Sequence, residues 1–101
     1  MDESKPPRAG PPGPGKFHLG RLLITPGAEA ILTSDEVMAA LGRHVRGDWG
    51  EVGADDAAEN ELSLRRGFRI LSAYRASSGV KFWIITEADR SATTVLLPEE
   101  Y

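Results

Sequence analysis

The chain has 101 residues, of which 41% are hydrophobic and 27% charged, a composition that fits one ordinary globular domain and excludes collagen-like and membrane-spanning chains. The net charge of −3 argues against a domain whose whole surface binds nucleic acid, and the absence of cysteine excludes disulfides and cysteine nucleophiles. Because the N-terminus lacks the apolar core of a secretory signal, we expect a cytoplasmic protein.

Residues 1–16 are rich in proline and glycine and hold no aliphatic side chain larger than alanine after Met1. Proline removes backbone donors and glycine raises the entropy cost of ordering a chain, so this segment is predicted to be a disordered tail. A single folded domain is then expected over residues 17–101.

The first segment of that domain, residues 17–25, contains an apolar run over 22–24 and ends at Pro26, a turn or helix-start signal. It is predicted to be a short strand or an extended lead-in, followed by one helical turn over 28–32. Whether it adds a strand to a sheet stays open at this point.

The clearest element is a helix over residues 34–46. It opens with a capping box, in which the Thr33 hydroxyl accepts from the Glu36 N–H and the Glu36 carboxylate accepts from the Thr33 N–H. Gly47 then supplies a left-handed stop. One apolar face carries residues four positions apart: Val37, Leu41 and Val45.

A second helix is predicted over residues 54–66. Two aspartates stand in its first turn and two arginines in its last, as the helix dipole favours, and Gly67 ends it. Its apolar face is thin, so it is expected to pack on another element.

Three strands are expected after the helices, over residues 68–75, 80–86 and 92–97, because short polar turns separate the apolar stretches. The predicted fold class is therefore α+β, with two helices followed by a three-stranded antiparallel meander, and with a short N-terminal strand left open. The middle strand is apolar on both faces. We expect its Trp83 and Ile85 to pack against the apolar face of the first helix, together with Phe68 or Leu71.

His44 is the first candidate for chemistry. It lies in the last turn of a helix, and Asp48 follows four residues later, so a carboxylate that orients the imidazole would make a general acid or base. The alternative is a structural histidine that binds the last helix carbonyls. With no third ligand and no phosphate-binding glycine loop, neither a metal nor a cofactor is expected.

The loop over residues 87–91 is the second candidate. Arg90, close to the hydroxyl of Thr93, suits an anion or a phosphate, and Arg75 at the end of an earlier strand is placed to join the same rim. The alternative is a plain turn, in which Asp89 makes an Asx contact and Arg90 pairs with Glu87 or Asp89.

Trp49 either anchors its loop on the core or fills a pocket of a partner. If the loops around residues 44–49 and 87–94 form one surface, it is a binding site. The candidate binding residues are then Asp48, Trp49, Asp89, Arg90 and Ser91, and the catalytic alternative uses His44, Arg75, Arg90 and Thr93.

Three segments together, HVRGDWGEV (44–52), SAYR (72–75) and WIITEADRSATTVLLPEEY (83–101), resemble a bacterial family labelled "plasmid-related protein". The family is encoded on plasmids, phages and integrative elements, and some relatives carry the label of a type I restriction enzyme modification subunit. The resemblance covers about residues 17–101. It implies a mobile-element setting and assigns no catalytic residue.

The order of helices followed by an antiparallel sheet is also similar to that of RelE, ParE and barnase-like ribonuclease toxins. Two functional hypotheses follow, and whether the protein is an enzyme stays open between them. The first is a non-catalytic protein-binding or regulatory module with a protein partner and no membrane contact, favoured by the acidic balance and the exposed end at residues 99–101. The alternative is an RNA-directed ribonuclease.

Overall fold

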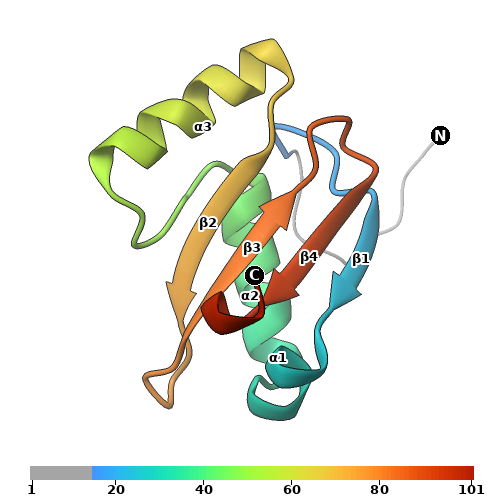
Figure 1. Ribbon diagram of the computed structural model, residues 1–101, viewed down its shortest axis with the longest axis vertical. Helices are drawn as coiled ribbons and strands as arrows, with labels where there is room; N and C mark the ends of the chain where they lie inside the picture. The colour runs from blue at the N-terminus through green and yellow to red at the C-terminus, as the bar shows by residue number, and fades with distance from the viewer. Residues whose placement is uncertain (1–14) are drawn as a thin grey trace, which may run out of the picture.

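A computed structural model describes residues 15–101, which form three α-helices, a four-stranded sheet and a short 3₁₀ helix (Figure 1). The elements are β1 Arg21–Ile24, α1 Pro26–Ile31, α2 Ser34–Val45, α3 Ala54–Arg66, β2 Ile70–Arg75, β3 Lys81–Thr86, β4 Ala92–Leu96 and η1 Pro98–Glu100. The α+β class is confirmed. The tail predicted over 1–16 lies outside the described residues except for its last two, and the Lys16 N–H already donates to the Val45 carbonyl at 2.7 Å.

The sheet has the strand order β1-β4-β3-β2. Strands β2, β3 and β4 form the antiparallel meander, but β1 pairs with β4 in parallel, with Leu22 beside Thr93 and Ile24 beside Val95. The sheet is therefore mixed and four-stranded rather than a three-stranded meander, and α1 makes a third helix. The parallel pair joins segments about seventy residues apart, a contact that no local pattern encodes.

The helix boundaries follow local chemistry closely. The capping box before α2 is present, with Glu36 N–H donating to Thr33 Oγ1 at 3.1 Å and Thr33 N–H to Glu36 Oε1 at 2.9 Å. Helix α3 has the predicted bounds and ends at Gly67, whose φ of 78° is left-handed. These ends depend on contacts between neighbours in sequence, which is why they were predictable.

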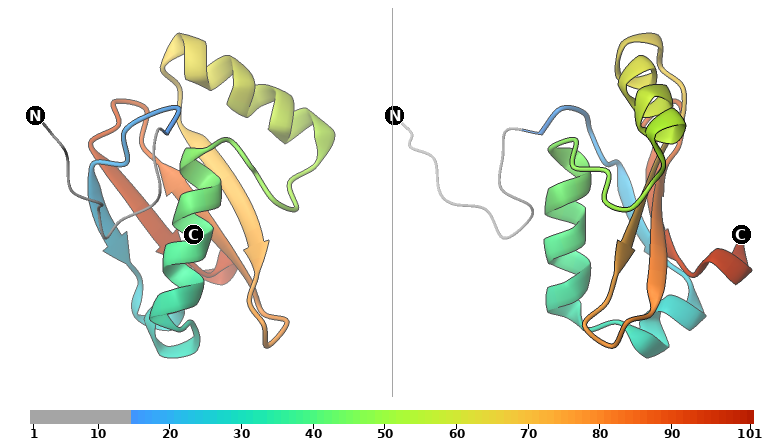
Figure 2. Two further views of the ribbon diagram at one scale, coloured as in Figure 1. Left: turned by 180° about the vertical axis from the view of Figure 1, so that it is seen from behind. Right: turned by 90° about the vertical axis from the view of Figure 1, so that its left-hand side faces the viewer.

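Helix α2 covers one face of the sheet, and the opposite face carries η1 near one end (Figure 2). Helix α3 lies beyond the upper end of β2 (Figure 1). The main core fills the space between α2 and the sheet. It contains Leu41 from α2, Tyr74 from β2, Phe82 and Ile84 from β3, and Val95 from β4.

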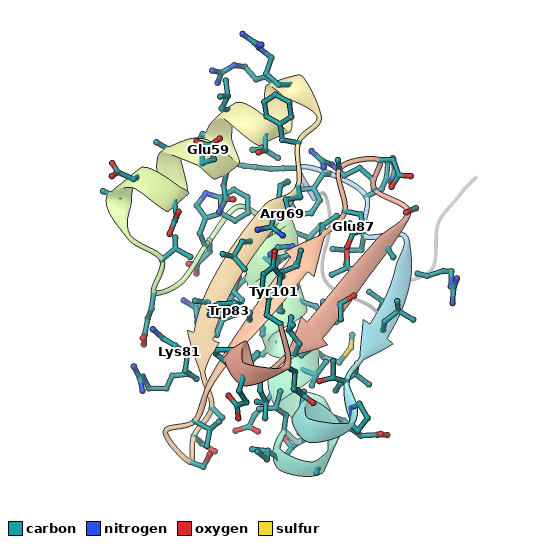
Figure 3. All side chains as sticks on the ribbon, in the orientation of Figure 1. Glu59, Arg69, Lys81, Trp83, Glu87 and Tyr101 are labelled. Carbon is teal, nitrogen blue, oxygen red and sulfur yellow. The ribbon has the colours of Figure 1, made fainter. Side chains whose placement is uncertain are left out.

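The prediction that Trp83 and Ile85 pack against α2 is wrong. Phe82 and Ile84 face α2, and because side chains alternate along a strand, Trp83 and Ile85 lie on the opposite face. There the Trp83 ring meets the ring of Tyr101 edge-on, with centroids 5.7 Å apart (Figure 3). Phe68 is 46% exposed. Each face of β3 carries two large apolar residues, so the alternation of side chains does not by itself show which face packs against α2.

Candidate functional site

His44 is completely buried between α2 and the sheet, at the centre of a chain of hydroxyl groups. Its Nδ1 lies 2.6 Å from Ser72 Oγ on β2, and its Nε2 lies 2.9 Å from Thr86 Oγ1 on β3. Thr86 Oγ1 is 2.7 Å from Thr93 Oγ1 on β4, which donates to the Leu19 carbonyl at 2.6 Å. The chain therefore links α2 to three strands and to the segment before β1.

The hydrogen-bond order in this chain fixes the tautomer of the neutral His44 ring. The Thr93 hydroxyl donates to Leu19, so it accepts from Thr86. Thr86 has then used its proton, so it accepts from the Nε2–H of His44. In the neutral ring Nδ1 carries no proton and accepts from the Ser72 hydroxyl. Every polar atom of the chain is satisfied when the imidazole is neutral.

The electrostatic surroundings also favour neutral His44. Burial, followed by the positive charge of Arg90, lowers the pKa of His44 from 6.5 to about 3. The rings of Phe17 and Trp49 stand edge-on to the imidazole at centroid distances of 5.2 and 6.1 Å and separate it from solvent. The arrangement is that of a structural histidine.

Asp48 does not orient His44. Its carboxylate accepts from the Arg43 guanidinium at 2.8 and 3.3 Å, and this arginine holds the pKa of Asp48 below its usual value. The Asp48 carbonyl accepts from the Tyr74 hydroxyl at 2.6 Å. Asp48 thus joins the turn after α2 to β2.

Trp49 anchors its loop. Its ring is buried and lies against Phe17 at a centroid distance of 6.3 Å, and its Nε1–H donates to Glu61 on α3 at 2.9 Å. The backbone on either side pairs with β2, since the Ala73 N–H donates to the Trp49 carbonyl at 3.1 Å and the Glu51 N–H to the Ala73 carbonyl at 2.7 Å. The loop therefore extends the sheet at the outer edge of β2.

Arg90 also has internal partners. Its backbone is left-handed, with φ of 62°, and its guanidinium donates at 2.7–3.2 Å to four backbone carbonyls, those of Ser63, Phe68, Glu87 and Ala88. Asp89 accepts from the Ser91 N–H at 3.0 Å, the Asx contact considered for a plain turn. The β3–β4 loop is thereby fastened to the end of α3.

Arg75 lies far from Arg90. It stands at the end of β2 beside the β2–β3 hairpin, whereas Arg90 belongs to the loop at the other end of the sheet (Figure 1). Its guanidinium pairs with Glu51 at 3.0 Å and donates to the Gly79 carbonyl at 3.1 Å. The structure thus joins His44 to Thr93 through Thr86 and brings Arg90 near them, but it does not bring Arg75 into a shared cleft.

Strand β1 carries three consecutive exposed aliphatic residues. Leu22, Leu23 and Ile24 are 51%, 40% and 39% exposed, and Met38 on α2 is 38% exposed. A shallow groove of about 320 Å³ runs between Ile24 and Met38 over Leu32 and Val37. The sequence showed the run at residues 22–24 but not its exposure. We call Leu22, Leu23, Ile24 and Met38 the β1 edge patch.

The backbone of β1 is also unpaired on its outer side within residues 15–101. The N–H groups of Arg21 and Thr25 donate to the carbonyls of Ser91 and Val95, both at 3.0 Å, so the odd-numbered residues bond to β4. In a parallel ladder the residues between them point their N–H and C=O groups the other way. Within the described part of the chain, Leu22 and Ile24 therefore present unpaired backbone donors and acceptors beside their aliphatic side chains.

No family model, curated protein or solved structure matches the chain. Within the described residues, no helix has the length and apolar character needed to cross a membrane. Likewise, no cluster of three His, Cys, Asp or Glu side chains suitable for a metal ion occurs in residues 15–101.

Proposed function

We propose that this chain is a non-catalytic protein-binding module, and that the β1 edge patch is where it binds its partner. The observation that carries the proposal is the coincidence, on one strand, of exposed aliphatic side chains with outward-facing backbone groups at Leu22 and Ile24. An extended peptide recognises such a strand through main-chain hydrogen bonds, and its side chains supply specificity.

The chemistry of the β1 edge patch defines the partner segment. The segment is extended, so that its backbone bonds to Leu22 and Ile24, and apolar at alternate positions, so that every second side chain meets the groove beside Met38. Glu29, which also lines this groove, favours a basic residue where the segment meets it.

The alternative, an RNA-directed ribonuclease, has less support. A general acid or base must reach the substrate, whereas His44 is sealed under Phe17 and Trp49 and its nitrogens are bonded to Ser72 and Thr86. The proposal therefore expects no cleavage of RNA by the purified protein and no growth arrest on overexpression. Cleavage that is lost in His44→Gln would favour the ribonuclease.

The resemblance of residues 44–52, 72–75 and 83–101 to the plasmid-related family supports a bacterial mobile element as the setting, and the cytoplasm as the compartment. In that setting the partner is a protein of the host or of the element itself, a second copy of this chain included. The role of the module is then to regulate or accompany that protein.

The test is capture from the native host with three forms of the chain: wild type, Leu22→Lys and Phe68→Lys. Phe68 is the matched control because it is a similarly exposed apolar residue away from β1. We expect one protein to be held by the wild type and by Phe68→Lys and to be lost with Leu22→Lys, because a lysine opposes pairing at a strand edge. Capture that is insensitive to Leu22→Lys would refute the β1 edge patch as the binding site.

A further inference from the structure

We infer that the β1 edge patch pairs with the same strand of a second copy, so that two four-stranded sheets join into one. The inference deepens the proposed function, since it rests on β1 being a docking surface. It comes from the strand itself, which is complementary to its own copy in hydrogen bonding, in shape and in charge.

Antiparallel pairing of the two β1 strands satisfies all of their outward-facing backbone groups. If two β1 strands run antiparallel about a two-fold axis at Leu23, then Leu22 of each copy lies opposite Ile24 of the other. These are the two residues whose N–H and C=O groups point outward. Each such pair exchanges two hydrogen bonds, so the four free donors and four free acceptors of the two strands are satisfied together.

The side chains agree with this register. Leu22 and Ile24 lie on the α2 face, so the two copies bring four aliphatic side chains together there, flanked by Met38 from each α2. Leu23 lies on the opposite face and meets Leu23 of the second copy at the axis. The exposed part of each of these side chains is removed from water, which provides the driving force.

The charges agree as well. In this register Arg21 of one copy lies opposite Thr25 of the other, and Thr25 Oγ1 donates to Glu100 at 2.5 Å. Arg21, Thr25 and η1 share one face of the sheet, so each Arg21 approaches a carboxylate of the other copy (Figure 2). The two Arg21 side chains stand at opposite ends of the paired strands and do not repel each other.

The pairing is small, with one four-residue strand from each copy. Interfaces at the low end of the size range bind weakly, so we expect a dissociation constant on the order of 10–100 µM. The wild-type chain should therefore shift from monomer to dimer over that range in sedimentation experiments. Leu23→Lys should remain monomeric, because it places two like charges at the axis, while Phe68→Lys should still dimerise.

Cross-linking tests the register directly, because the chain has no cysteine of its own. Residues opposite each other at a non-hydrogen-bonded position have Cα atoms about 4.5 Å apart, a separation that a disulfide spans. Leu23→Cys should therefore form a disulfide dimer at least about tenfold faster than Phe68→Cys, a residue of similar exposure.

Equal cross-linking rates, or a wild-type chain that stays monomeric at about 500 µM, would overturn the inference. If capture of another protein still depends on Leu22 in that case, the proposed function stands and its occupant is that protein. If neither dimer nor capture is found, both proposals fail.

Discussion

The two edge strands of the sheet, β2 and β1, differ in whether their outward backbone groups are paired within the described residues. At the β2 edge, Asn60 of α3 acts as a substitute peptide group, donating to the Leu71 carbonyl at 2.7 Å and accepting from the Leu71 N–H at 3.1 Å. The segment around Trp49 then pairs with Ala73 two residues further along. At the β1 edge, no part of residues 15–101 pairs with Leu22 or Ile24.

The difference indicates that another chain can pair with the β1 edge but not with the covered β2 edge. An unpaired strand edge is a template for another chain, and proteins usually cover or charge it. Here one edge is covered by a side chain and a loop that belong to the fold, while the other keeps aliphatic residues in the open. The following predictions test that contrast, from the largest effect to the smallest.

Trp49→Ala should produce the largest loss of stability. The substitution removes a buried ring that holds Phe17, Glu61 and the segment paired with β2, and such truncations cost about 3–5 kcal/mol. Urea unfolding measures the change. Trp83→Ala is the matched control, since Trp83 is only half-buried on the open face, and its loss should be smaller. Equal losses would contradict the role of Trp49 in closing the β2 edge.

Asn60→Ala should cost about 2–3 kcal/mol, because it leaves the partly buried N–H and C=O of Leu71 without their Asn60 partner. Glu59→Ala, an exposed neighbour on α3, should stay within about 0.5 kcal/mol of the wild type. The two variants are compared by urea unfolding. A loss at Asn60 no greater than at Glu59 would show that Asn60 does not close the edge.

Acid should lower the unfolding free energy of the protein through His44. Its folded pKa of about 3 lies below the unfolded value of 6.5, so the unfolded state binds the proton first. The His44 contribution is complete above pH 6.5 and is lost as the pH falls from 6.5 towards 3, with a slope of up to about 1.4 kcal/mol per pH unit.

Carboxylates contribute only at lower pH. Glu36, for example, has a pKa lowered from 4.5 to about 2, chiefly by its bond to the Thr33 backbone. Unfolding free energies measured between pH 7 and pH 5 therefore isolate His44. The wild type should lose stability over that interval and His44→Gln should not, and a flat wild-type profile would contradict the buried neutral imidazole.

Leu22→Lys should change the unfolding free energy least, by within about 0.5 kcal/mol, because the Leu22 side chain is already 51% exposed. Its effect should fall on association instead, measured as loss of dimer or of the captured protein. A large loss of stability would mean that the β1 edge patch is part of the core and not a free surface.

Local chemistry determined much of this protein in advance. The capping box of Thr33 and Glu36, the left-handed stop at Gly67 and the Asx contact of Asp89 each involve residues within three or four positions of one another. The helices over 34–45 and 54–66 and the three later strands follow from such signals together with apolar periodicity. The α+β class could therefore be derived from the sequence alone.

Contacts between distant segments were decided only by the tertiary structure. The parallel pairing of β1 with β4, the choice of Phe82 over Trp83 to face α2, and the use of Asn60 to close β2 each join segments with no shared local signal. The role of Arg90 was also decided by the tertiary structure. Its charge alone does not show that its guanidinium donates to four backbone carbonyls. The physical reason is that burial and edge pairing are properties of the assembled layers, so a residue's role depends on which neighbour the fold brings to it.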